Sequence, residues 1–416
     1  MSHVSLIAAV EDWLVGKALG DPEIRILFEK LSERLHGLGI PLDRASLSWP
    51  TLHPLFKSEQ VFWRRGEGAV LNQYEHSDGP TDAWIKSPLA HVHLQGLAHL
   101  RRRLTGDGAM LDFEVLEEFQ QQGFTDYLVT STQFGIGDVA EFAGKSTGII
   151  ASWATKRQSG FTDDDLDALR RIQRVFAVAC RASIQRRVTD NIAAAYLGPT
   201  AGHQVLQGEI RRGDGDMLPA VVWFSDLRGS TRLSDTMDPD SYLALLNRYF
   251  ECTAGPVIEH GGEILNFIGD GVLAIFPIHE KCPMEATAQA EAAVHDALAA
   301  CVQAEKDGTP GGAPLRFGIG LDIGEVMFGN IGVPSRLAFS GIGKVVNTVQ
   351  RIESHTKKID TTVLASAAFA EAAPGDWASA GEIEIRDFDR RVQVFTLAET
   401  APARVEEGTS ARTAAE

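Results

Sequence analysis

The chain has 416 residues, of which 44% are hydrophobic and 23% are charged, and its formal net charge at pH 7 is −17. This length exceeds the size at which a single hydrophobic core stops growing, so we expect two domains and a connector. The acidic balance excludes a nucleic-acid polymer as the main partner, because phosphate backbones are bound by basic surfaces. A small nucleotide remains possible, since it needs only a few arginines, backbone N–H groups and metal ions.

The sequence predicts neither a membrane span nor an export signal. Charged residues interrupt the N-terminal stretch, and no uncharged apolar run reaches the roughly 18 residues that a span requires. The four cysteines are scattered without a CxxC pair, which argues against a zinc site and against a disulfide framework. We therefore expect a cytoplasmic protein.

Residues 1–160 mix helical periods with short strand-like runs, and we expect them to form a regulatory or sensor-like α+β domain. The end of this region, from Gly148 through the acidic segment near Asp164, resembles the end of a GAF domain. A scaffold without a ligand is the alternative. His91, His93 and His99 are interpreted as packed or surface side chains, because closed metal sites demand a more complete set of ligands.

A long helix is predicted next, within a connector and hinge at 161–219. Thr162 and Asp165 form a capping-box pattern. Apolar residues then recur at helical spacing over roughly thirty residues: Leu166, Leu169, Ile172, Phe176, Ile184 and Val188. The helix is either a core element of the first domain or a dimerising connector, and its charged second half favours the connector. The turn-rich residues 198–219, with RRGDGD, predict a hinge.

From Ala220 the pattern changes to alternating strands and helices. The expected elements are a strand at 220–226, a helix from Pro239 capped by Asp238, a hairpin at 264–276, a helix at 283–306, and strands at 315–326 and 327–332. This order predicts a ferredoxin-like βαββαβ domain at 220–398, an α/β fold of the α+β type with helices on one face of an antiparallel sheet. Residues 399–416 are small and polar, and we expect a disordered tail.

Two aspartates are placed where this topology can bring them together. Asp226 ends the first strand, and Asp270 lies in the Gly-Asp-Gly turn of the hairpin. Taken alone, each is an ordinary turn residue. Taken together, with no nearby His or Cys, they suit a hard cation such as Mg²⁺ that also binds substrate phosphate oxygens.

Asn347 and Arg351 lie four residues apart on a predicted helix and therefore share one face. A solvated polar face is the simplest explanation. Neighbouring valines, Val345, Val346 and Val349, make the segment apolar enough to be packed. A bound nucleotide would then supply partners for the amide and the guanidinium.

Four segments occur in order: WFSDLRGST, GGEILNFIGDGVLAIF, GEVMFGNIG and GKVVNTVQRIE. Together they resemble the catalytic domain of the class III adenylate and guanylate cyclases, over about 180 residues that start at Ala220. RRGDGD resembles the hinge of bacterial soluble members that carry an N-terminal regulatory region. The resemblance implies conversion of ATP to 3′,5′-cyclic AMP and pyrophosphate by in-line attack of the ribose 3′-hydroxyl on the α-phosphate.

The resemblance also implies roles for individual residues. Asp226, Leu227 and Asp270 correspond to the residues that bind two Mg²⁺ or Mn²⁺ ions per site. Asn347 corresponds to the ribose-orienting asparagine, and Arg351 to the arginine that stabilises the α-phosphate. The family's site lies between two catalytic domains, so the resemblance implies a homodimer in which one copy supplies the aspartates and the other supplies Asn and Arg.

Further candidates bind the phosphates and the base. The turn after Asp226 is expected to hold the β- and γ-phosphates, and the C-terminal arginines are candidates for the triphosphate: Arg228, Gly229, Ser230, Thr231, Arg386, Arg390 and Arg391. Ser230 stands where the family usually has phenylalanine. Asn266 and Ser340 occupy the base-reading positions, where adenylate cyclases usually have lysine, and guanylate cyclases glutamate, in place of Asn266.

The base remains open, because a primary amide can pair with adenine or with guanine. The rest of the motif set favours ATP. A guanylate cyclase is one alternative, and a catalytically silent nucleotide-binding regulator is another. The retained Asp226, Asp270, Asn347 and Arg351 argue against the silent alternative.

Overall fold

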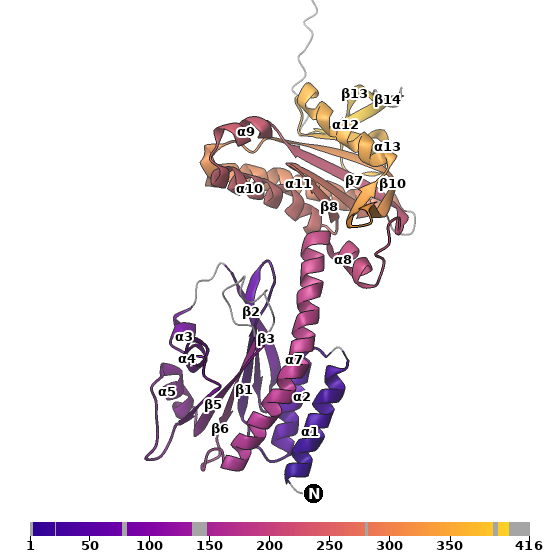
Figure 1. Cartoon of the computed structure of the whole chain (residues 1–416). Coiled ribbons are helices and arrows are strands. Elements are labelled where there is room, and N and C mark those ends of the chain that lie inside the picture. The colour runs from indigo at the N-terminus through magenta and orange to yellow at the C-terminus, as the bar shows by residue number, and fades with distance from the viewer. Residues whose placement is uncertain are drawn as a thin grey trace, which may run out of the picture. The chain divides into compact units, whose positions relative to one another are not determined.

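The computed structural model describes residues 3–20, 22–76, 81–134, 148–278, 282–385 and 390–398. Its internal contacts divide the chain into two compact units, Met1–Tyr196 and Leu197–Glu416, which are described separately (Figure 1). The predicted tail at 399–416 lies outside the described residues.

The first unit is a six-stranded antiparallel sheet with helices on both faces (Figure 1). Its strands run in the order β3-β2-β1-β6-β5-β4, with bounds β1 Arg44–Pro50, β2 Phe56–Arg64, β3 Gly68–Glu75, β4 His99–Arg103, β5 Asp126–Gln133 and β6 Gly148–Thr155. Its helices are α1 His3–Ala18, α2 Ile24–Gly37, α3 Asp82–Ile85, α4 Pro88–Leu94, α5 Glu114–Gln121 and α7 Asp163–Leu197. Helices α1, α2 and α7 pack on one face and α4 and α5 on the other, because strand alternation gives each face its own apolar cluster.

Helix α7 begins with the capping box that the sequence predicts. The Thr162 Oγ1 accepts from the Asp165 N–H at 3.2 Å, and the Asp165 carboxylate accepts from the Thr162 N–H at 2.8 Å. The helix is buried in the first unit as far as Ile184, and no residue of its remaining length is buried. Its first part is thus a core helix of the first unit, and its second part is exposed. The boundary between the two units lies at Tyr196 instead of at residue 160.

The predicted hinge at 198–219 is more regular than expected. It contains helix α8, Pro199–Leu206, and the first residues of strand β7, Gly215–Leu227. Ala201 of α8 is buried against the sheet of the second unit. Apolar burial of one helix face therefore overrides the turn-rich composition of this segment.

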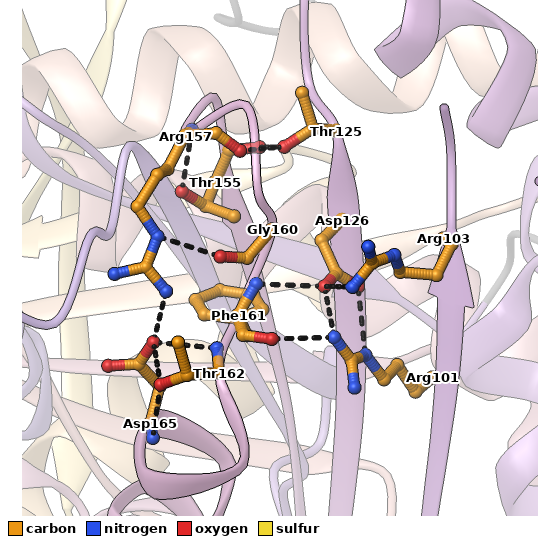
Figure 2. A network of polar contacts seen from close by, with 10 residues as sticks. All are labelled: Arg101, Arg103, Thr125, Asp126, Thr155, Arg157, Gly160, Phe161, Thr162 and Asp165. Carbon is orange, nitrogen blue, oxygen red and sulfur yellow. Dashed lines mark hydrogen bonds and ion pairs between the residues drawn. The ribbon is translucent and has the colours of Figure 1, made fainter. Parts of the chain in front are cut away.

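A buried polar network fixes the start of α7 to strands β4 and β5 (Figure 2). The Asp126 side chain is fully buried and accepts two hydrogen bonds from Arg101, at 2.6 and 3.2 Å, and one from the Phe161 N–H at 2.9 Å. Arg101 also donates to the Phe161 carbonyl at 2.7 Å. Gly160 has φ +69°, and a Cβ there would lie 2.5 Å from an Asp126 oxygen, so only glycine allows this approach.

The second unit contains the predicted ferredoxin-like core. Strand β7, helix α10 Pro239–Glu259, strands β8 Glu263–Ile268 and β9 Gly271–Pro277, helix α11 Pro283–Asp307 and strand β10 Phe317–Val333 follow one another. The sheet order β10-β7-β9-β8 is the order of a βαββαβ fold. Asp238 caps α10 by accepting from the Ser241 N–H at 2.9 Å, as the sequence predicts.

The remaining elements extend this core. They are α9 Ser230–Thr236, the short 3₁₀ helix η1 Pro310–Gly312, β11 Arg336–Ile342, α12 Lys344–Ile359, β12 Val363–Ser366, α13 Ala367–Ala372, β13 Trp377–Ile385 and β14 Arg390–Leu397. The two strands expected at 315–332 form one continuous strand, β10. Helices α10 and α11, the two helices of the predicted βαββαβ core, cover one face of the sheet as expected, whereas α12 and α8 cover the other.

The Asp126 network generates a stability prediction. Replacing Asp126 by Ala is expected to destabilise the first unit by about 3 kcal/mol, because Arg101 loses the buried carboxylate that compensates its charge. Unfolding of the full chain can be followed by tryptophan fluorescence, since Trp13, Trp49, Trp63, Trp84 and Trp153 belong to this unit and only two tryptophans to the other.

The matched control is Asp167→Ala, which removes an exposed ion pair with Arg170 on the same helix and is expected to change stability by at most about 0.5 kcal/mol. Equal effects of the two substitutions would contradict the account.

Candidate functional site

The two aspartates meet at one edge of the sheet of the second unit. Strand β7 is buried from Ala220 to Ser225, and Asp226 emerges at its end, partly exposed. In the antiparallel pairing of β7 with β9, Asp226 lies directly opposite Gly271, the residue after Asp270. The two carboxylates are close enough for Asp270 to contribute to the pKa of Asp226.

The hairpin turn uses its two glycines for different reasons. Gly269 has φ +63° and forms the two-residue turn with Asp270, a conformation that favours glycine. Gly271 has no positive φ, but a Cβ there would lie 2.9 Å from the Phe224 ring. Gly269 therefore provides the positive φ of the turn, whereas Gly271 provides space.

The surroundings of the Asp226 carboxylate disfavour its negative charge. Burial, and then the like charge of Asp270, raise the pKa of Asp226, whereas Lys357 lowers it. The Lys357 Nζ lies 3.5 Å from the Asp226 Oδ2. The site thus attracts positive charge, and its oxygen-only donors fit a hard divalent cation.

No group of three His, Cys, Asp or Glu residues suited to a metal occurs within the described residues. An ion held by the two carboxylates would therefore need further ligands from water or from phosphate oxygens, as Mg²⁺ sites commonly do. His91, His93 and His99 likewise form no such group.

Lys357 and Glu353 of α12 were missed by the sequence analysis. Glu353 is only 2% exposed, its Oε1 has no hydrogen-bond partner among the described residues, and a Cβ on Gly318 would collide with it. Burial raises the pKa of Glu353 to about 7, and Asp226 contributes to the rise. The available signal was a glutamate placed on the apolar face of a helix.

Helix α12 packs along β10, and its direction places Lys357 near Asp226 and Asn347 far from it. Close approaches link Gly324 to Val345 and Gly318 to Thr356, so the Lys357 end of the helix lies at Asp226. Asn347 precedes Lys357 by ten residues, or about 15 Å of helix. Asn347 and Arg351 are both exposed, so the valine face packs without enclosing them.

The two base-reading candidates are brought together by β8 and β11. The Asn266 Nδ2 donates to the Ser340 Oγ at 2.5 Å. Asn266 is partly exposed and Ser340 is buried. With this bond made, the amide retains its carbonyl acceptor and one N–H donor, and the hydroxyl retains its O–H donor.

The turn after Asp226 has fewer free donors than expected. The Leu227 side chain is buried in the core, so only its backbone can face a metal. The Arg228 N–H donates to the Arg316 carbonyl at 2.7 Å and its side chain to the Thr361 carbonyl, so the fold itself uses the backbone N–H and part of the guanidinium. Gly229 has φ +76° and starts α9, so the N–H groups of Ser230 and Thr231 lie in a first helical turn without intrahelical acceptors.

Of the three C-terminal arginines, the structure describes only the side chain of Arg391. Arg386 lies outside the described residues, as does the side chain of Arg390. Arg391 is exposed on β14, with its Nη1 3.8 Å from Glu382. Strands β12 and β10 separate β14 from β7, which places β14 about 14 Å from β7.

Residues 217–395 match the family profile of the adenylate and guanylate cyclase catalytic domain. An adenylate cyclase of Anabaena cylindrica is 32% identical over 148 residues, 35% of this chain and 28% of that protein. Adenylate cyclase 1 of Rhizobium meliloti is 31% identical over 151 residues, 36% of this chain and 22% of its own length. The chain thus spans about a quarter of the length of these two curated relatives.

Two solved structures are also similar to this chain. The guanylyl cyclase Cya2 is 31% identical, with a TM-score of 0.37 and coverage of 44% of this chain and 92% of the other. A bacterial light-regulated adenylyl cyclase is 23% identical, with a TM-score of 0.39 and coverage of 45% and 93%. Among the described residues of our chain, no helix has the length and apolar character needed to cross a membrane.

The buried Glu353 generates a pH prediction for the metal-free protein. Its pKa rises from 4.5 to about 7 on folding. Between these values the unfolded chain gives up the proton while the folded chain keeps it, so the stability of the second unit should fall from about pH 4.5 to 7 and then level off. The fall should be about 3 kcal/mol.

Glu353→Gln cannot ionise and should lack this fall. Chemical denaturation of both proteins between pH 5 and 8, with a chelator present, measures the difference. Parallel stability curves for the two proteins would rule out an ionisable Glu353 in the folded core.

Proposed function

Because the second unit of this chain belongs to the adenylate and guanylate cyclase catalytic domain family, we propose that the protein converts ATP to 3′,5′-cyclic AMP and pyrophosphate. The observation that carries the proposal is the pairing of β7 with β9, which sets Asp226 beside the Asp270 turn. The ribose 3′-hydroxyl attacks the α-phosphorus in line, and pyrophosphate leaves.

Asp226 and Asp270 would hold Mg²⁺ or Mn²⁺, two ions per site. When bound, such ions lower the pKa of the ribose hydroxyl and neutralise the triphosphate. The raised pKa of Asp226 supports this assignment, because a divalent cation relieves the repulsion between the two carboxylates. Lys357, which lies 3.5 Å from Asp226, offers a single positive charge to the same oxygens.

We propose that the site is composite, formed by two copies of the chain. Asn347 orients the ribose, and Arg351 stabilises charge on the α-phosphate through its planar fork of donors. Within one chain Asn347 is about 15 Å of helix away from the Asp226 end of α12. A ribose whose 3′-hydroxyl reacts beside Asp226 would therefore not reach Asn347 of the same chain, whereas a homodimer with two sites could bring both residues to one nucleotide.

The base is read by Asn266 and Ser340 in this proposal. Their mutual hydrogen bond leaves the amide oxygen as an acceptor and the second amide N–H and the hydroxyl as donors. An acceptor beside a donor fits the N6 amine and N1 of adenine but also N1–H and O6 of guanine. The named adenylate cyclases among the relatives favour ATP. A guanylate cyclase is the second candidate, favoured by the absence of lysine at 266.

We further propose that the first unit regulates the second, and that the protein acts in the cytoplasm. Strand β5 supports the regulatory role, since its Asp126 holds the first turn of α7 and the adjacent Tyr127 lines a cavity. The four cysteines are all free thiols, which fits a reducing compartment.

The composite site can be tested by mixing inactive variants. Asp226→Asn and Arg351→Ala should each lower cyclase activity at least about 100-fold. Mixed and allowed to exchange subunits, they should recover about a quarter of wild-type activity, because half of the dimers then contain one intact site of two. Cyclic nucleotide production is measured before and after mixing.

The matched control mixes Asp226→Asn with Asp270→Asn, which damage the same half of the site and should give no recovery. Arg248→Ala, on an exposed arginine of α10, should retain wild-type activity. Full activity of Arg351→Ala, or equal recovery in both mixtures, would contradict the composite site.

Base choice can be tested at Asn266 with equimolar ATP and GTP and identification of the products by mass spectrometry. Asn266→Lys offers only donors and should raise the ratio of ATP to GTP turnover about tenfold, whereas Asn266→Glu offers only acceptors and should lower it similarly. Asn266→Gln keeps the amide and should stay near the wild-type ratio. If the Lys and Glu variants leave the ratio unchanged, Asn266 does not read the base.

A further inference from the structure

The first unit contains a cavity of about 980 Å³. It lies on the face of the sheet that carries α3, α4 and α5, opposite the face covered by α1, α2 and α7 (Figure 1). Strands β1, β2, β5 and β6 form its floor, and residues from the three short helices line it as well. Its volume is that of a site for a small organic molecule.

The floor of the cavity is unusually polar for a sheet that is covered on both faces. Strand β1 places Arg44, Ser46 and Ser48 on this side, while its alternate residues join the apolar core of the other side. The Ser46 and Ser152 hydroxyls are 2.6 Å apart. The Ser48 Oγ is buried and has no hydrogen-bond partner among the described residues.

Arg44 is a charged residue of the cavity floor whose charge no carboxylate among the described residues compensates. Its guanidinium carbon lies 4.6 Å from the centroid of the Phe119 ring and 5.3 Å from that of Phe62. Burial lowers the pKa of Arg44, and no carboxylate within the described part of the chain opposes that effect. An arginine shielded from water by aromatic rings normally has an anionic partner.

The other charged side chains of the lining limit how much negative charge a bound molecule can carry. They include both signs: Lys57, Lys86, Asp82, Glu114 and Glu118. The Glu59 carboxylate instead accepts from Arg187 of α7 on the other face of the sheet. A polyanion would meet these carboxylates without an excess of cations. One uncompensated guanidinium matches one carboxylate, which it can bind with two parallel hydrogen bonds.

The aromatic side chains of the lining indicate the shape and polarity of the rest of the bound molecule. Phe62, Trp84, Phe119 and Tyr127 all face the cavity. Flat apolar groups stack on such rings, and most of a bound small molecule's surface is normally buried against apolar side chains. A planar organic body next to the carboxylate therefore fits this surface.

We propose that this cavity binds a small aromatic monocarboxylate, with Arg44 as the anchor of its carboxylate group. Ser48 supplies a further hydroxyl to the bound anion, and the aromatic rings enclose the body of the ligand. The site is separate from the nucleotide site, and its existence does not depend on the proposed cyclase activity.

The proposal can be tested by calorimetric titration of the full chain with benzoate, phenylacetate and 3-phenylpropionate, each compared with its neutral amide. At least one acid should bind about tenfold or more tightly than its amide, because the amide cannot form the charge-assisted pair. Equal affinities for acid and amide in all three pairs, or no binding of any acid, would overturn the proposal. Displacement of the bound acid by an equal concentration of inorganic phosphate would do so too.

Two substitutions locate the site. Arg44→Gln should abolish the preference for the acid, whereas Arg64→Gln, the exposed residue opposite Arg44 in the strand pairing, should keep it. Arg44→Lys keeps the charge but loses the planar fork, so it should bind the acid more weakly while still preferring it over the amide. Circular dichroism checks folding. If Arg44→Gln does not fold, unchanged acid affinity in Arg44→Lys would overturn the assignment.

Discussion

The antiparallel pairing of β7 with β9 is the constraint on which the second unit's site depends. Its register places Asp226 opposite Gly271 and thus beside Asp270. A slip by one residue would turn the Asp226 side chain to the other face of the sheet and disrupt the buried run that precedes it. The ring of Phe224, packed against Gly271, leaves no space for a larger residue there and helps to hold the register. The proposed metal site, with only two carboxylates, would require this precision.

Under the proposed composite site, one chain holds two incomplete halves of a site. Glycines along β10 let α12 pack closely and fix its direction, with Lys357 at Asp226 and Asn347 about 15 Å away along the helix. The same arrangement buries Glu353 beneath the aspartates, where its ionisation is costly. Negative charge thus accumulates at this edge of the sheet, and a cation, whether Lys357 or a metal, offsets it.

Sequence patterns predicted much of this architecture where local signals agree with tertiary structure. The strand and helix order, the Asp238 cap, the hairpin and the capping box at Thr162 follow from residue type and spacing alone. Three features do not follow from local signals: the continuous β10, the helix within the expected hinge and the second covered face of the sheet. Packing against distant segments decides them. Lys357 and Arg44 were missed for the same reason: their importance lies in what surrounds them, and nothing in their immediate sequence reveals it. Glu353 carried one signal, its position on the apolar face of a helix.

The central claim is that the two aspartates belong to a nucleotide cyclase site. The most direct test incubates the purified full chain with ATP and Mn²⁺ and identifies the products by mass spectrometry. The account predicts cyclic AMP and pyrophosphate in equal amounts, with loss of both in the Asp270→Asn variant and in the presence of a chelator. Tight binding of ATP with no cyclic product, from ATP or from GTP, would contradict the account and indicate a silent nucleotide-binding protein.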